Sequence, residues 1–220
     1  MEKLSKVIVL ILFLIGGTLF LFNNFVSNYN HLIEKTEHKI EGVEFAQKIQ
    51  KFILKLQKLR GYSQFEKNFL SDASWSVVEN NVLLIKSDIK KDLLTIKKFN
   101  KLYPTLYSSD YDNILKEVES LIEKDYEDRT VLYQKYTYMI EQLQEKMYNL
   151  GFKSELLLES ESDKYFLVET MLRYIPNYIE VIGKIRAKTS KAITDNFTDD
   201  ELIYSIKNNC QLCDEHGNLI

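Results

Sequence analysis

Apolar residues are distributed along the chain in two different patterns. Residues 7–22 carry no charge and one polar side chain, Thr18, and the uncharged segment extends through Asn23 and Asn24 to Val26. A helix of about 20 residues rises roughly 30 Å, which is enough to cross the hydrocarbon core of a bilayer. The pattern therefore predicts a transmembrane helix near the N-terminus.

The charges beside this run predict its orientation. Lys3 and Lys6 precede it, and no Lys or Arg follows until Lys35. The positive-inside rule then places the N-terminus in the cytoplasm and everything after the span outside. A cleaved signal peptide is the alternative, but its apolar region is normally shorter and no small-x-small cleavage site follows. We expect residues 1–27 to form a cytoplasmic stub and an uncleaved anchor in a bacterial inner membrane.

The remaining chain has the periodicity of amphipathic helices and no strand pattern. Ser71 or Asp72 and Asp163 are expected N-caps, and Pro176 predicts a kink or a new first turn. With only 7 Gly and 2 Pro, long helices joined by short connections predict an antiparallel bundle. The expected fold is thus all-α: the anchor, an extracytoplasmic bundle at 28–194, and a short helix with a polar tail at 195–220. The expected helices cover 30–66, 73–102, 108–124, 126–159 and 163–193, and a capping box at 198–201 opens the last one.

Composition and motifs exclude several function classes. The net charge of -3, with both signs interspersed, argues against nucleic-acid binding. Cys210, Cys213 and His216 supply at most three ligands, whereas a structural zinc site uses four, so a disulfide or a fortuitous tail sequence is the alternative. No nucleophile motif, phosphate-binding glycine loop or histidine pair at ligand spacing occurs. We expect no enzyme activity, no metal and no cofactor.

Two arginines fall on apolar helical faces. In the first outer helix, Arg60 lies within a stripe, with Gln57 at its edge and Gly61 beside it. Arg186 lies within a second predicted stripe. A buried guanidinium needs a partner, because an unpaired charge out of water is strongly unfavourable. Either each arginine pairs with an internal carboxylate or reaches the bundle edge, or an anionic or polar ligand lies between the helices. The first stripe comprises Phe45, Ile49, Phe52, Ile53, Leu56 and Leu59, the second Met171, Leu172, Ile175, Ile179, Ile182 and Ile193, and the candidate carboxylates are Glu44, Glu169 and Glu180.

The strings around both arginines resemble a known family. LQKLRGYS at 56–63 resembles the LQxxRGxS signature of the nitrate- and nitrite-sensing domain, a helical periplasmic sensor of chemoreceptors, histidine kinases and diguanylate cyclases. EGVEF at 41–45, DKYFL at 163–167 and IGKIR at 182–186, with a proline before the last, are similar to neighbouring segments of such domains. Leu59, Tyr62 and Ala187 depart from the family pattern, which argues against nitrate itself as the ligand.

The resemblance implies a membrane-anchored periplasmic sensor in bacterial signal transduction. It would place Gln57, Arg60, Gly61 and Arg186 near a site for a small anionic or polar ligand, and it implies a homodimer. Because no return span follows, the chain is either truncated or signals through a cytoplasmic or membrane partner. The alternative is a membrane-tethered helical scaffold that binds a partner protein and no small ligand.

Overall fold

The computed structural model describes residues 2–104, 106, 109–124, 128–158, 160–194, 204, 207 and 208. For residues 2–15 it describes the helical backbone and not the side chains. The chain divides into two compact units, residues 1–40 and 41–220.

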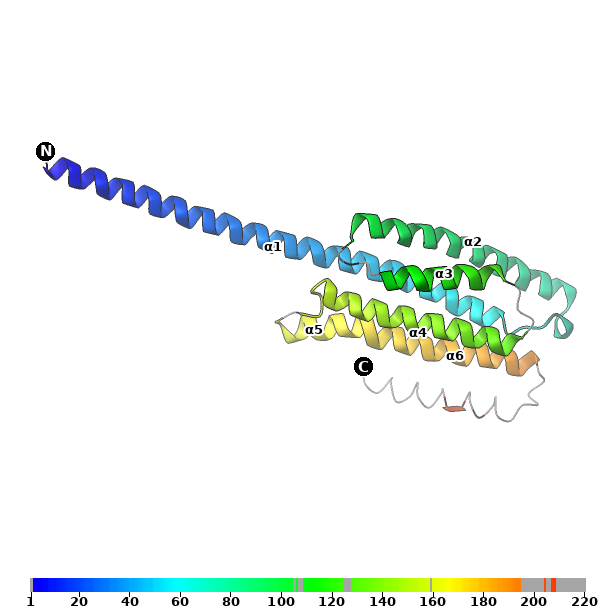
Figure 1. Cartoon of the computed structure of the whole chain (residues 1–220). Coiled ribbons are helices and arrows are strands. Elements are labelled where there is room, and N and C mark those ends of the chain that lie inside the picture. Colours follow the sequence, from blue (N-terminus) through cyan, green and yellow to red (C-terminus); the bar gives the residue numbers. More distant parts are fainter. Residues whose placement is uncertain are drawn as a thin grey trace. The chain divides into compact units, whose positions relative to one another are not determined.

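The described residues are helical and contain no strand, which confirms the all-α prediction (Figure 1). The expected helices 73–102, 108–124 and 126–159 occur with their ends shifted, the helix expected from residue 30 is part of a longer α1, and the helix expected at 163–193 is divided by a π-helical turn. Within the second unit, α3 packs against both α2 and α4, and α4 packs against the turn that precedes α6. The elements are α1 (Glu2–Tyr62), a 3₁₀ turn (Lys67–Phe69), α2 (Asp72–Leu102), α3 (Ser109–Glu123), α4 (Arg129–Lys153), α5 (Ser162–Glu169), a π-helical turn (Thr170–Tyr174) and α6 (Ile175–Thr194).

The core of the second unit is built around the last turns of α1. All six residues of the first predicted stripe are at most 2% exposed, so that prediction is confirmed. Phe45 stacks on Phe99 of α2, with ring centroids 4.8 Å apart, and lies 5.4 Å from the ring of Tyr111 in α3. Offset aromatic pairs at these separations add to the free energy gained by burial. Residues 41–62 of α1 are therefore the element that joins the other helices into one core.

Local capping explains where several helices begin. The Ser71 hydroxyl accepts a hydrogen bond from the Ser74 amide, which confirms the predicted cap of α2. The Asp128 carboxylate caps α4 in the same way, through the amides of Thr130 and Val131. The predicted Asp163 cap is wrong: the N-cap of α5 is Glu161, and Asp163 lies in the first turn, where its charge favours the helix dipole.

Pro176 is the second residue of α6, and an irregular turn precedes that helix. A proline inside a helix removes one amide donor and clashes with the preceding turn. Here Thr170–Tyr174 widen into a π-helical turn immediately before α6. The Pro176 carbonyl accepts a hydrogen bond from the Gln144 side chain at 2.9 Å, which ties this irregularity to α4. The predicted kink is thus a π-helical turn followed by a new α-helix.

The second predicted apolar stripe is wrong for four of its six residues, whereas Leu172 is buried as predicted and Ile179 is half-buried. Met171, Ile182 and Ile193 are 59%, 45% and 54% exposed, and Ile175 is also exposed. The buried face of α6 instead carries mostly small or polar residues. The short side chains allow this helix to approach its neighbours closely, and Glu180 faces inward to pair with Arg60. These buried residues are Pro176, Glu180, Gly183, Ala187, Ala192 and Thr194.

The first unit, residues 1–40, contains the N-terminal part of α1. Its described apolar side chains, such as Phe20, Leu21 and Phe22, are exposed. Among the side chains that the structure describes, no helix combines the length and the hydropathy needed to cross a membrane. The first half of the predicted span, residues 7–15, lies outside those described side chains. The predicted capping box at 198–201, both cysteines and His216 also lie outside the described residues.

Candidate ligand-binding site

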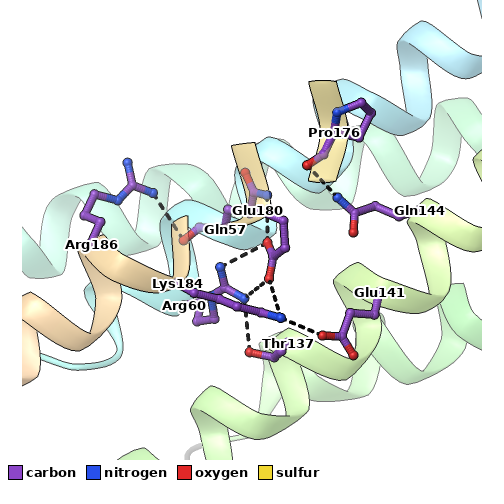
Figure 2. Close-up of polar contacts among 9 residues, drawn as sticks. All are labelled: Gln57, Arg60, Thr137, Glu141, Gln144, Pro176, Glu180, Lys184 and Arg186. Carbon is purple, nitrogen blue, oxygen red and sulfur yellow. Dashed lines mark hydrogen bonds and ion pairs between the residues drawn. The ribbon is translucent and has the colours of Figure 1, made fainter. Parts of the chain in front are cut away.

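Arg60 is fully enclosed and is neutralised inside the bundle (Figure 2). Its Nη1 lies 2.5 Å from Oε1 of Glu180, and its Nη2 donates to Oε2 of the same carboxylate at 3.1 Å. Gln57 Nε2 donates to Oε2 at 2.8 Å, and Arg60 Nη1 also donates to the Thr137 hydroxyl at 3.0 Å. Of the two alternatives for Arg60, the structure contains the internal carboxylate. We call Gln57, Arg60, Thr137 and Glu180 the buried cluster.

The surroundings of the buried cluster fit a guanidinium closely. The Arg60 Cζ lies 5.4 Å from the ring centroid of Tyr133, a cation–π distance. Burial raises the pKa of the Tyr133 hydroxyl, while the nearby Arg60 charge opposes that rise. A Cβ atom at Gly183 would lie only 2.9 Å from Arg60 Nη2, so the absence of a side chain there makes room for the arginine. The Arg60 Nε is buried and has no hydrogen-bond partner among the described residues.

Two lysines add positive charge beside the buried cluster. Lys184 Nζ lies 2.7 Å from Glu141 Oε1 and 3.8 Å from Glu180 Oε1. Burial lowers the pKa of Lys188, and the charges of Lys184 and Arg60 lower it further. Glu180 therefore contacts two cations, Arg60 and Lys184, and Glu141 balances the second of them.

Arg186 lies elsewhere, and its predicted inward position is wrong. The residue is exposed, because it shares the outward face of α6 with Ile182 and Ile193. Its Nη2 donates a long hydrogen bond, 3.4 Å, to the Gln57 carbonyl oxygen, and Figure 2 shows the guanidinium directed toward Gln57, with no contact to Glu180. Gly61 is buried beneath it: a Cβ atom there would lie 3.6 Å from Arg186 Nε.

Arg186 and Gly61 line a groove of about 480 Å³ between the end of α1, the middle of α2 and α6. We call it the arginine groove. Lys58 lies on the same rim and is exposed, whereas Lys55 is held by Asp92 at 2.6 Å. The remaining lining residues are Tyr62, Phe65, Asn81, Leu84, Ile85, Asp88 and Ser190.

The four predicted site residues thus separate into two adjacent pairs. Gln57 and Arg60 belong to the buried cluster, where both side chains bond to the Glu180 carboxylate. Gly61 and Arg186 line the arginine groove. The sequence reasoning missed Thr137, Tyr133 and Lys58. The sequence pattern could have identified Lys58, since it lies one turn before Tyr62 on the side of α1 away from the apolar stripe. It could not have identified Thr137 and Tyr133, because their role depends on how α4 packs against α1.

Comparisons with models of protein families, with curated proteins and with solved structures find no match to this chain. The resemblance to the nitrate- and nitrite-sensing domain therefore stays a prediction. Within the described residues, no group of three or more His, Cys, Asp or Glu side chains is placed to hold a metal ion.

Gly183→Ala should destabilise the protein by about 1–3 kcal/mol, as overpacked interiors typically do. The added methyl group would lie against Arg60 Nη2, and the enclosed arginine can move only by weakening its bonds to Glu180. Urea unfolding of the full chain in detergent, followed by circular dichroism, measures the effect. Gly61→Ala is the matched control, since its methyl group makes only an ordinary contact and alanine favours a helix by up to ~1 kcal/mol. Equal losses in the two variants would contradict the close fit at Gly183.

Proposed function

We propose that this chain is a membrane-anchored, extracytoplasmic sensor module of a bacterial receptor, and that it binds a small anion in the arginine groove. The observation that carries the proposal is Arg186, an exposed guanidinium on the rim of a groove whose floor includes Gly61. The resemblance of residues 35–193 to periplasmic sensor domains supports the same assignment.

The charges of the groove favour an anion. Arg186 and Lys58 supply cationic donors, and the nearest acids are engaged: Asp92 pairs with Lys55 and Asp88 with Lys91. Ser190, Asn81 and Tyr62 offer neutral polar groups around them. A guanidinium presents a planar fork of donors that suits carboxylates and similar oxyanions. A volume of about 480 Å³ is within the usual range of small-molecule sites, roughly 300–1,000 Å³.

The buried cluster supports the proposal in a structural role. Glu180 already neutralises Arg60. An added anion would therefore bind with a more favourable free energy at Arg186, where no carboxylate lies within ion-pair distance among the described residues. Since Arg186 bonds to the Gln57 carbonyl, an anion bound there would act on the same turn of α1. Helix displacements of about 1–2 Å are typical of such switches. In the proposed receptor, α1 transmits this displacement to the anchor and to a signalling partner.

Arg186→Gln should weaken anion binding about tenfold or more, because a charge-assisted hydrogen bond contributes roughly 1.5–3 kcal/mol. The measurement is isothermal titration of the full chain in detergent with nitrate, acetate, succinate and aspartate. Unfolding stability should not change, since Arg186 is exposed.

Lys58→Gln should weaken the same binding by a smaller factor, and Lys116→Gln is the control, because Lys116 is exposed on α3 outside the groove. If none of these anions binds, or if Arg186→Gln binds as the wild type does, the sensor proposal fails. The membrane-tethered scaffold would then be favoured.

The proposed topology predicts which thiols are reachable from outside the cell. A membrane-impermeant maleimide, applied to intact spheroplasts after mild reduction, should label Cys210 and Cys213, the two cysteines of the chain. A Cys210→Ser/Cys213→Ser chain with Ser5→Cys is the matched control and should react only after lysis. Labelling of the native cysteines only after lysis would exclude an extracytoplasmic position, and extraction of the chain by alkaline carbonate would exclude the anchor.

The proposed receptor is a homodimer, and the outward face of α6 supports this. Ile175, Ile182 and Ile193 recur at intervals of seven and eleven residues, so their exposed side chains lie along one line of the helix. Two anchored copies would meet side by side with parallel α6 helices.

Ile175→Glu should convert the dimer into a monomer, because it would place a carboxylate from each copy among the isoleucines of the seam, eleven residues from the nearest cation on that face, Arg186. Light scattering with size exclusion in detergent should give twice the mass of one chain for the wild type. Leu94→Glu, at a more exposed position of α2, should leave that mass unchanged. A wild-type mass of a single chain would contradict the dimer.

A further inference from the structure

A second groove lies on the other side of Tyr62 and Phe65, which line both grooves. It encloses about 500 Å³ between the end of α1, the start of α2, the end of α3 and the start of α4. Of its other residues, the sequence reasoning singled out only Leu59 and Ser63, which belong to the segment 56–63. We call it the aromatic groove.

The floor and one wall of the aromatic groove are apolar. Leu59 and Tyr136 are each 2% exposed at its base, and the half-buried Val78 and Val82 line the side formed by α2. Trp75, the single tryptophan of the chain, lies half-buried in the same wall. With Tyr62 and Phe65, these residues offer aromatic surface to a flat ring, which prefers offset or edge contacts with other rings.

The rim of the aromatic groove is positively charged. Its lining contains four cationic and two acidic side chains, a net charge of +2. Arg129 is held at 2.5 Å by one of the two acids, Glu66, and also donates to the Gln64 carbonyl oxygen at 2.9 Å. The three lysines form no ion pair with a described side chain. They are Lys67, Lys86 and Lys124.

We propose that the aromatic groove is a second binding site, and that its ligand is a small aromatic carboxylate. The ring would lie against Trp75 and the α2 wall, and the carboxylate would face Lys86 and Lys124. The apolar floor disfavours a bare inorganic anion, which would lose water without gaining donors there. The cationic rim disfavours a neutral or cationic aromatic molecule. This site is distinct from the proposed anion site, because Arg186 and Lys58 do not line it.

Trp75 makes the site directly measurable, since tryptophan fluorescence in this chain arises from that residue alone. Benzoate added to the full chain in detergent should change Trp75 emission in a saturable way. Acetate, which has the charge without the ring, and benzyl alcohol, which has the ring without the charge, should give no saturation at the same concentrations. Lys86→Gln and Lys124→Gln should each weaken benzoate binding roughly two- to fivefold, as expected for partly solvated charges.

Two neighbouring valines provide the matched pair of variants. Val78→Phe fills the groove and should abolish the benzoate response, whereas Val77→Phe adds the same ring at a 60% exposed position outside the groove and should preserve it. Arg186→Gln should also preserve it, which separates this site from the arginine groove. A linear response to benzoate, an equal response to acetate, or equal binding by the two valine variants would overturn the proposal.

Discussion

The enclosed pair of Arg60 and Glu180 constrains the arrangement of α1, α4 and α6. A guanidinium with no exposed surface is tolerated only when its charge and most of its donors are satisfied. Glu180 must therefore face inward on α6, Thr137 must reach Arg60 from α4, and Gly183 must lack a side chain. The rotation of α6 about its axis follows from these three requirements.

That rotation also determines what the outer surface presents. Once Glu180 and Gly183 face inward, Ile182, Arg186 and Ile193 face outward, although a purely hydrophobic criterion would bury the two isoleucines. The arginine that a ligand can reach is thus Arg186 on the rim of the arginine groove, and not Arg60 in the interior. The same rotation places Ile182 and Ile193 on the face of α6 that carries Arg186, so the ligand site and the proposed dimer interface would share that face.

The sequence predicted the helices well and the site only in part. The stripe from Phe45 to Leu59 was predictable because α1 buries one regular face, and Arg60 was recognisable as its polar exception. Glu180 could be included among three candidate carboxylates but not selected, because selection requires knowing how α6 is rotated. In α6, apolar residues occur on more than one side of the helix, so the apolar periodicity alone predicted the wrong buried face. The two grooves are lined by residues up to 135 and 77 positions apart, which no local pattern relates.

The most direct test of this account is a double-mutant cycle between Arg60 and Glu180, measured by urea unfolding of the full chain. Arg60→Met and Glu180→Leu should each cost about 3 kcal/mol or more, since each leaves a buried group without its partner. The double variant should cost at least ~2 kcal/mol less than the sum of the two single losses. Losses that add to within ~0.5 kcal/mol would show that the two side chains do not depend on each other, and would contradict the arrangement of α6 from which the rest is inferred.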